Sequence, residues 1–246
     1  MTGAASHRAV PIGLSSRLDL VAAGSVFRRH GRVHIADILE QDAAIALHGC
    51  LQKEVPWRLS FNLGDRNANL AEEDVKKFAD VDRLTLNSQF LASAQRGFQY
   101  VFGNWPIYDL WKAGTPQPPL MVQAIEFLNS RTFLEFMRQM TGLAEIAYAD
   151  AQATRYGPGH FLTRHDDSVA RKGRLAAYVL SLTPRWMPDW GGILQFFDPL
   201  GHVEEGYVPS FNALNVFRVP APHAVSYVTP FTASSRYSIS GWLWSE

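Results

Sequence analysis

Apolar residues in the first half of the chain recur every three or four positions, which is the spacing of an amphipathic helix. This spacing predicts helices over three segments, each with a polar residue near its start that can cap the first turn. The segments are Gln41–Glu54, Asn87–Phe98 and Thr132–Met140. Gly103–Pro119, which lies between the last two, is rich in Trp, Pro and Gly and is expected to be a loop.

After Ala144 the pattern changes to short apolar runs separated by Gly, Pro and Asp. Runs of this kind and density predict the strands of a sandwich or a barrel. The runs are Ile146–Tyr156, Leu175–Leu182, Ile193–Phe197, Ala213–Val219, Ala224–Thr229 and Tyr237–Trp244. A short apolar segment at Val33–Ile35 is expected to join the same sheet.

This change of pattern predicts an α+β fold with a mainly β core and a helical N-terminal support. Residues 1–12 are expected to form a flexible tail, residues 13–144 a mainly helical part that packs on the core, and residues 145–246 the β core itself. We expect the last two parts to be one integrated domain, because 246 residues suit a single core with a helical annex.

Composition narrows the classes of protein that remain. Apolar residues make up 47% of the chain and charged residues 19%, which supports a buried core and excludes a disordered chain. Lys plus Arg equals Asp plus Glu at 23 each, so the overall charge predicts attraction to neither nucleic acid nor membranes. The single cysteine, Cys50, is expected to be a buried structural thiol. One thiol cannot form an internal disulfide and no apolar run spans a bilayer, so the expected location is cytoplasmic.

His165 and Asp167 are the first candidates for chemistry. They are two residues apart, and on a strand such residues point to the same face. A third ligand has to come from elsewhere, and His223 stands at the head of another predicted strand. Two His and one carboxylate on one face of an octahedral iron leave three positions open, the arrangement that oxygen chemistry needs. A His-x-Asp pair is also common as a plain hydrogen-bonded pair, so this alternative stays open at this point.

Arg236 extends the pattern. It opens the predicted strand segment Arg236–Trp242. On that strand Arg236, Ser238 and Ser240 would share one face. A buried Arg is costly unless it is paired, and a dicarboxylate ligand would supply the partner through a bidentate fork, with Ser238 as a further donor. Tyr156, on the strand before His165, could reach the same carboxylate. The alternatives are an Arg paired with an acidic residue and a tyrosine of the core.

The combination of these residues resembles the iron(II)/2-oxoglutarate dioxygenases, in particular the prolyl-hydroxylase-like group that includes the yeast ribosomal-protein prolyl hydroxylase. The order and spacing of the matching segments are specific, although no single segment is. The segments are Tyr156, His165–Asp167, Arg174–Leu182, Trp190–Leu194, Asn215–Phe217, His223 and Arg236–Trp242. The resemblance covers the C-terminal part of the chain, and the N-terminal half matches only in its helical character.

The resemblance implies a double-stranded β-helix, a jelly-roll or cupin-like barrel of two antiparallel sheets. The implied site residues are His165, Asp167 and His223 for Fe(II), and Arg236 and Tyr156 for 2-oxoglutarate, with Ser238 added from its place on the strand face of Arg236. The implied reaction uses O2 to hydroxylate a C–H bond of a prolyl residue in a protein or peptide, and it releases succinate and CO2, with ascorbate as an optional reductant. Asp166 is expected to point away from the metal, because strand neighbours alternate between faces.

Two features depart from the group. The interval between His223 and Arg236 is longer than is usual, which predicts an extended hairpin through Thr229–Ser235. The basic residue is Arg rather than the Lys of collagen-type prolyl hydroxylases. This second difference argues against that branch and leaves the general chemistry intact.

Other functions remain open. The same chemistry could act on a free amino acid or a small metabolite. A nucleic-acid demethylase of the repair type carries a second Arg downstream of the one that binds 2-oxoglutarate, and Arg236–Trp242 lacks it. A non-enzymatic cupin-like binding module or a zinc hydrolase could use the same barrel. We expect a protein, peptide or small-molecule substrate and no nucleic-acid or membrane partner, and we leave a homodimer open.

Overall fold

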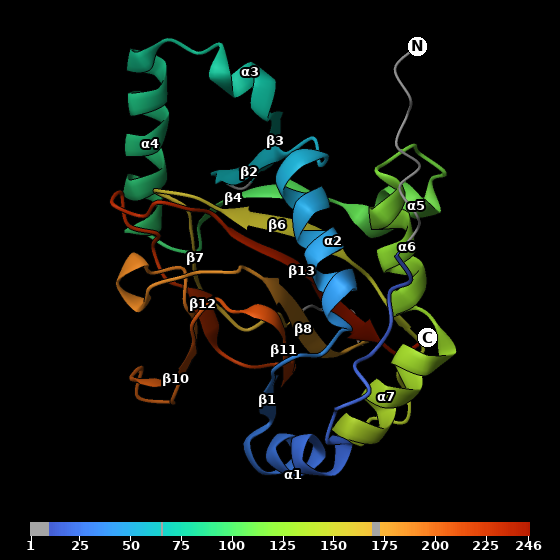
Figure 1. Cartoon of the computed structure of the whole chain (residues 1–246). Helices are drawn as coiled ribbons and strands as arrows, with labels where there is room; N and C mark the ends of the chain where they lie inside the picture. The colour runs from blue at the N-terminus through green and yellow to red at the C-terminus, as the bar shows by residue number, and fades with distance from the viewer. Residues whose placement is uncertain (1–9, 65, 169–172) are drawn as a thin grey trace, which may run out of the picture.

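The computed structural model describes residues 10–64, 66–168 and 173–246 (Figure 1). Residues 1–9, which make up most of the expected flexible tail, lie outside this description. Helices are found in the first part of the chain. They are α1 (Leu20–His30), α2 (Gln41–Lys53), α3 (Glu72–Lys76), α4 (Asp80–Ala94), α5 (Ile107–Lys112), α6 (Pro119–Leu128) and α7 (Arg131–Thr141). No helix among the described residues combines the length and the apolar character needed to cross a bilayer.

The strands form one antiparallel sheet that curls into a nearly closed barrel. The N-terminal strands are β1 (Arg32–Ile35), β2 (Arg58–Leu63), β3 (Arg66–Ala71) and β4 (Tyr100–Trp105). The others are β5 (Tyr148–Ala149), β6 (Gln152–Tyr156), β7 (Phe161–His165), β8 (Arg174–Leu182), β9 (Leu194–Phe197), β10 (Val203–Tyr207), β11 (Phe211–Arg218), β12 (His223–Val225) and β13 (Arg236–Trp244). Their order in the sheet is β1-β11-β8-β13-β6-β4-β7-β12-β9-β10, with the β2–β3 hairpin paired to β4 and β5 paired to β13.

Side-chain contacts join the two edge strands of the sheet, β1 and β10. β1 is the first strand of the sheet order and β10 the last. Arg32 on β1 forms ion pairs with Glu205 and, at 2.7 Å, with Glu204, both on β10. Its guanidinium also lies 5.0 Å from the centroid of the Phe196 ring on β9. These contacts bring the open edges of the sheet together at a seam, which we call the Arg32 seam.

Strands from both parts of the chain share this sheet. β1 pairs with β11, and β4 pairs with β6 and β7, so strands from residues 13–144 are hydrogen bonded between or beside strands of the β core. The expected segment at Val33–Ile35 is therefore a strand of the sheet, as predicted. The division at residue 144 stays a prediction.

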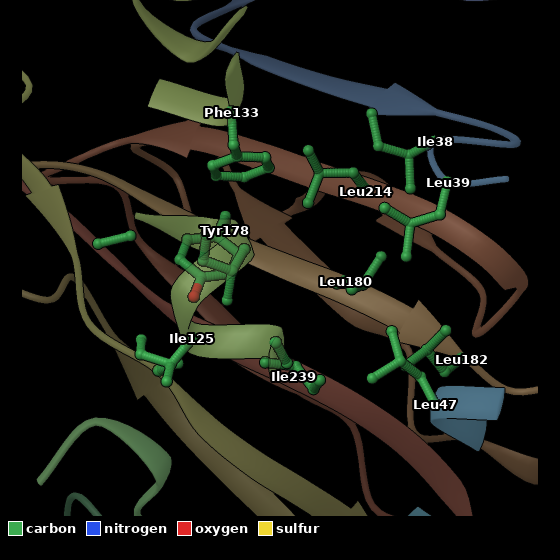
Figure 2. Close-up of a cluster of buried hydrophobic side chains, with 14 of the residues drawn as sticks. Ile38, Leu39, Leu47, Ile125, Phe133, Tyr178, Leu180, Leu182, Leu214 and Ile239 are labelled. Carbon is green, nitrogen blue, oxygen red and sulfur yellow. The ribbon is translucent and has the colours of Figure 1, made fainter. Parts of the chain in front are cut away.

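The main hydrophobic core lies between α1, α2, α6, α7 and one face of the sheet (Figure 2). Along β13, side chains alternate between this core and the inside of the barrel, as strand geometry requires. Ile239 is fully buried in the core, whereas Arg236 and Ser238 point into the barrel. Tyr178 on β8 is also fully buried, and its hydroxyl donates to the Asp150 carbonyl at 2.7 Å. The same strands thus build the core on one face and a cavity on the other.

Two of the three predicted helices match α7 and α2 closely. α7 begins after Ser130, whose side chain accepts from the Phe133 amide at 3.2 Å, and it ends at Gly142 with φ 71°. Both features belong to standard helix capping. α2 matches its predicted range to within one residue. The helix expected at Asn87–Phe98 instead runs from Asp80 to Ala94. Its bounds were missed because its apolar residues are mostly exposed, so the apolar pattern does not mark where the helix begins and ends.

The prediction of a loop over Gly103–Pro119 was wrong. This segment contains the end of β4 and the whole of α5, and Pro106 occupies the position just before that helix. Gly103 is a strand residue of β4. A Cβ at this position would come within 3.3 Å of Arg155 on the neighbouring strand, which favours glycine there. Close strand packing, rather than a turn, explains this glycine. The predicted strand at Ile146–Tyr156 is divided into β5 and β6.

Candidate active site

The inner face of the barrel surrounds a cavity of about 540 Å³. The four inward positions of β13 all line it. They are Arg236, Ser238, Ser240 and Trp242. Side chains from β4, β6, β7, β8, β9, β11 and β12 also line the wall, and the β2–β3 hairpin adds Ser60 and Asn67. Every residue proposed from the sequence for metal or co-substrate binding lines this one cavity.

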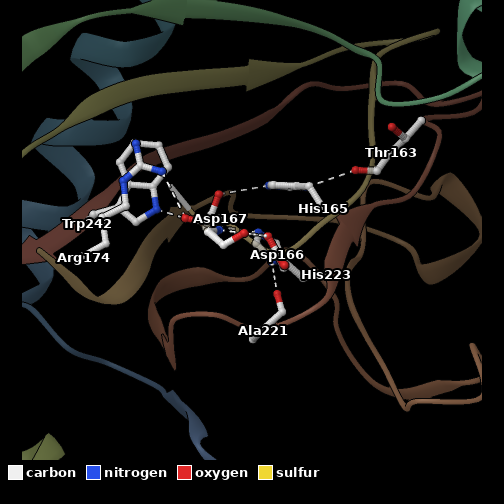
Figure 3. Close-up of polar contacts among 9 residues, drawn as sticks. Thr163, His165, Asp166, Asp167, Arg174, Ala221, His223 and Trp242 are labelled. Atoms are coloured by element: carbon white, nitrogen blue, oxygen red, sulfur yellow. Dashed lines mark hydrogen bonds and ion pairs between the residues drawn. The ribbon is translucent and has the colours of Figure 1, made fainter. Parts of the chain in front are cut away.

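His165, Asp167 and His223 come together at one point of the cavity (Figure 3). His165 ends β7 and His223 begins β12, and the two are register partners in the antiparallel pair. The Nε2 atom of His165 lies 3.3 Å from Oδ1 of Asp167, and the Nε2 atom of His223 lies 3.6 Å from Oδ2. One nitrogen or oxygen of each residue lies within 4.8 Å of the others, which is close enough for a shared metal ion.

Hydrogen bonds fix the ring orientation of both histidines. Nδ1 of His165 lies 3.0 Å from the Thr163 carbonyl, and Nδ1 of His223 lies 2.7 Å from the Ala221 carbonyl (Figure 3). A carbonyl only accepts, so each Nδ1 carries the proton and, in a neutral ring, each Nε2 keeps a free lone pair. Burial, together with the neighbouring His165 ring, lowers the pKa of His223 to about 4. At neutral pH His223 can therefore act as a metal ligand.

Asp167 reaches the histidines by a turn and not by strand alternation, so the reason first given for its position was wrong. β7 ends at His165, and Asp167 adopts a left-handed backbone with φ 61°. This conformation is uncommon outside glycine and occurs often at functional sites. Asp166 is exposed and accepts from the amide and hydroxyl of Ser168, at 2.9 and 2.6 Å. It lies outside the cluster of candidate ligands, as expected.

The Asp167 carboxylate is held in its ionised form. Burial raises its pKa, but the proximity of His165 and His223 and the hydrogen bond from Trp242 outweigh this effect. The net pKa therefore lies below the ordinary value for aspartate. An ionised carboxylate beside two imidazoles is the donor set that non-haem iron(II) takes in a facial triad.

Arg236 occupies a different part of the cavity and has no acidic partner among the described residues. Only 3% of the residue is exposed. Its Nη1 donates to the Gly192 carbonyl at 2.8 Å, while its buried Nε has no partner in the part of the chain that the structure describes. Burial lowers the pKa of Arg236, because the charged form is poorly solvated. A buried guanidinium with free donors could hold the carboxylate of a bound acid.

Tyr156 and Ser238 flank Arg236. Tyr156 is the register partner of Arg236 between β6 and β13, and its ring centroid lies 5.2 Å from the guanidinium carbon. Burial raises its pKa, so its hydroxyl stays protonated and can donate. The Ser238 hydroxyl lies 2.7 Å from that of Thr154 and keeps capacity for one more hydrogen bond. The structure thus places both predicted side chains beside Arg236.

The two glycines before β9 allow the chain to pass close to Arg236. A Cβ on Gly191 would lie 2.0 Å from the Tyr227 carbonyl oxygen, and this residue has φ 71°. Gly192 has φ 65°, and a Cβ there would lie 3.2 Å from Trp186 and from Val228. Only glycine fits such positions. The close approach places the Gly192 carbonyl where Arg236 donates to it.

Sequence reasoning missed three groups of cavity residues. Asn104 lies on β4, in the segment taken for a loop, and its buried Oδ1 has no partner among the described residues. Ser60 and Asn67 come from the hairpin that the apolar pattern did not reveal. Trp242 could have been found, because it shares the strand face of Arg236, Ser238 and Ser240. Its indole N–H donates to Oδ2 of Asp167 at 2.9 Å.

Comparison with known proteins gives a consistent result for the C-terminal part of the chain. Residues 151–244 match the sequence model of the 2OG-Fe(II) oxygenase superfamily. Prolyl 3-hydroxylase OGFOD1 of Mus musculus is 31% identical over 130 residues, which are 50% of this chain and 23% of that protein. The Xenopus laevis protein of the same name is 28% identical over 128 residues, or 49% of this chain and 24% of that one. The chain thus spans about a quarter of the length of these relatives.

Solved structures share the fold. A prolyl 4-hydroxylase from Pseudomonas putida matches with a TM-score of 0.59 and 20% identity, over 93% of this chain and 100% of that one. A prolyl hydroxylase from Trichoplax adhaerens, solved with a peptide fragment of the hypoxia-inducible factor oxygen degradation domain, has a TM-score of 0.54. It is 16% identical, and the match covers 92% of this chain and 89% of that protein. The expected double-stranded β-helix is therefore confirmed.

Proposed function

We propose that this chain, which carries a 2OG-Fe(II) oxygenase superfamily domain in residues 151–244, is a dioxygenase that hydroxylates a prolyl residue of a protein or peptide. One observation carries the proposal. A His-Asp-His cluster and a buried arginine without an acidic partner line the same cavity. The superfamily match spans all four of these residues, and curated relatives over half the chain are named as prolyl 3-hydroxylases.

His165, Asp167 and His223 would hold Fe(II), and Arg236 would bind the distal carboxylate of 2-oxoglutarate. When bound, the iron and 2-oxoglutarate supply O2-dependent oxidation of a C–H bond, with succinate and CO2 as co-products. Each His offers an Nε2 lone pair because a backbone carbonyl holds its Nδ1 proton. Arg236 has a fork of donors that matches a carboxylate, and the protonated Tyr156 hydroxyl adds another donor from β6.

The wall of the cavity favours an uncharged substrate group. Apart from the histidine pair, its basic residues among the described chain are Arg174 and Arg236. Arg236 is assigned to the co-substrate, and Arg174 is stacked on Trp242 with 3.7 Å between guanidinium carbon and ring centroid. The remaining polar groups are neutral amides and hydroxyls, among them Asn67, Asn104 and Gln152. Such groups can pair with peptide bonds, whereas a free amino acid brings two charges that need partners.

Anaerobic titration tests the assignment of the site. Addition of Fe(II) and then 2-oxoglutarate should produce a weak visible charge-transfer band, because a facial triad leaves positions at which the keto acid can chelate. The Asp167→Ala protein should give no band. A wild-type protein that gives no band and forms no succinate in air would exclude the dioxygenase and favour a binding module. Succinate formation without O2 dependence would exclude it as well.

Competition between substrates tests the substrate class. Proline within a peptide blocked at both ends should stimulate succinate formation, while free proline should not, since Arg174, the wall guanidinium left beside Arg236, is already stacked on Trp242 and bonded to the Asp167 carbonyl. Stimulation by free proline and none by blocked peptides would favour the alternative, the same chemistry on a free amino acid. Mass spectrometry of the peptide should show one added oxygen atom on proline.

We also propose a cytoplasmic setting, with ascorbate as a reductant that keeps the iron in its ferrous state. Cys50 is the single cysteine, it is buried, and burial raises the pKa of its thiol to about 12. A thiol of this kind is unreactive and suits a reducing compartment. Fluorescence localisation of the tagged full-length protein in its own cells is the measurement that checks the compartment.

A further inference from the structure

We propose that Trp242 and Arg174 are positioning residues that hold Asp167 so that it ligates the metal through a single oxygen, Oδ1. This inference rests on the proposed metal site. The Trp242 indole N–H donates to Oδ2 at 2.9 Å, while Oδ1 receives no such bond and lies 3.3 Å from Nε2 of His165 (Figure 3). One carboxylate oxygen is thus engaged by the protein before any metal arrives.

Ligation through one oxygen matters because of the number of positions on the metal. A facial triad with a monodentate carboxylate leaves three positions of an octahedron, which the keto acid and O2 together require. A carboxylate bound through both oxygens would occupy one of them. An indole donor on Oδ2 weakens that oxygen as a ligand and fixes the plane of the carboxylate. Trp242 therefore protects an open position as well as orienting Asp167.

Arg174 acts on the same aspartate from its backbone side. Its Nη1 donates to the Asp167 carbonyl at 3.3 Å, and Asp167 is the residue with the left-handed φ of 61°. The Arg174 guanidinium carbon lies 3.7 Å from the Trp242 ring centroid and 5.2 Å from that of Trp244. One side chain thus supports the unusual backbone of Asp167 and packs against the indole that binds its carboxylate.

The Trp242 side of this arrangement is fixed by Asp150, which lies just before β6. The Asp150 carboxylate accepts from the Trp242 backbone amide at 2.6 Å and from the Trp244 indole at 2.9 Å. Gly241, which precedes Trp242, also packs tightly on Asp150. A Cβ on Gly241 would lie 2.2 Å from the Asp150 carbonyl oxygen. The position of Trp242 is therefore set by buried contacts and does not depend on a bound metal.

Trp244 provides a matched control within the same strand. Both tryptophans lie on β13, both have the Arg174 guanidinium over the ring, and both donate an indole N–H to a partly buried aspartate. They differ in their acceptors, since Asp167 belongs to the metal cluster and Asp150 does not. Replacement by Phe removes one N–H from each and keeps most of the ring. A purely structural role would affect both variants alike.

Cobalt(II) binding tests the inference without turnover. Titration of the metal-free protein gives a dissociation constant, and the visible d–d bands of bound cobalt report its coordination number. We expect Trp242→Phe to weaken cobalt binding by about 10- to 100-fold, as is typical when a group that orients a ligand is removed, and to change the bands. Trp244→Phe should bind within roughly threefold of wild type with unchanged bands, because Asp150 keeps the Trp242 backbone amide as a donor and does not belong to the metal cluster.

Arg174→Met is the second variant, because it keeps an apolar chain on the indole and removes the donor to the Asp167 carbonyl. It should also weaken cobalt binding, and it decides the matter if Trp242→Phe does not fold. Wild-type affinity and bands in the folded Trp242→Phe protein, or in Arg174→Met if only that variant folds, would overturn the inference. Equal losses in Trp242→Phe and Trp244→Phe would do so too. A wild-type protein that binds no cobalt would instead refute the proposed metal site.

Discussion

His223 lies directly opposite His165 in the pairing of β12 with β7, and the centroids of the two rings are 4.1 Å apart. The His165 ring disfavours protonation of His223 at this distance, which leaves the Nε2 lone pair of His223 free for a metal ion. Asp167 supplies a carboxylate beside both, and the shared position next to all three is suited to a metal ion.

Removal of a single ligand is expected to abolish turnover. His165→Ala, Asp167→Ala and His223→Ala should each lose O2-dependent succinate formation, because two ligands no longer hold Fe(II) in the cavity. Asp166→Ala is the matched control, since that carboxylate is adjacent in sequence but exposed and bound to Ser168. It should keep near wild-type activity. Normal turnover by the Asp167→Ala protein would remove the assignment of that ligand.

Arg236→Ala should mainly raise the concentration of 2-oxoglutarate that is needed. Loss of one partner from a buried charge pair costs about 2–5 kcal/mol, or roughly 30-fold or more in affinity. The measurement is the 2-oxoglutarate dependence of succinate formation, with metal affinity followed separately. Arg155→Ala is the control, because Arg155 pairs with Glu72 and does not line the cavity. An unchanged 2-oxoglutarate requirement in Arg236→Ala would place the co-substrate elsewhere.

The Arg32 seam should contribute modestly to stability. Arg32→Gln removes the contacts to Glu204, Glu205 and Phe196, and we expect a loss of about 1 kcal/mol in the free energy of unfolding. The value is small because both glutamates are more than a third exposed and water screens the charges. Urea denaturation at low and high salt measures it, and high salt should reduce the difference. Lys77→Gln, at an exposed pair on the other side of the barrel, should leave the midpoint unchanged.

Acidification should destabilise the fold through His160. Burial lowers its pKa to about 4, against an ordinary value of 6.5, so the unfolded chain binds this proton more readily than the folded chain. The contribution of neutral His160 to the free energy of unfolding is therefore fully present above pH 6.5. It is lost as the pH falls towards 4, by an amount on the order of 3 kcal/mol. Urea denaturation of wild type and His160→Asn over this range isolates the effect. The exposed His202→Asn serves as control, and parallel pH profiles for wild type and His160→Asn would contradict the assignment.

The fold could be predicted in part. The short apolar runs after Ala144 identified β8, β9, β11 and β13, because these strands carry buried apolar residues. The β2–β3 hairpin was missed, since its polar residues face the cavity and solvent and leave no apolar period. The bounds of α4 were wrong for the same reason, since Phe90 is the one buried residue of that helix. An apolar pattern predicts a helix or strand only where one side of that element is buried.

The candidate site followed a similar division. Residue types and their order in the chain were enough to select His165, Asp167, His223 and Arg236, because metal ligation and carboxylate binding need those donors. The grouping of these residues required the register of β12 against β7 and of β13 against β6, which local sequence does not encode. Asp167 illustrates the difference, since it was expected on a strand and instead lies beyond the end of β7 with a left-handed backbone.

The sequence by itself determined which chemical groups are present and which strand faces are apolar, because both follow from the nature and spacing of side chains. Only the tertiary structure decided that Trp242 donates to Asp167, that Arg174 supports the backbone of the same residue, and that neutral amides of β3 and β4 line the cavity. These contacts join residues far apart in the chain, and closure of the barrel is the physical event that brings them together.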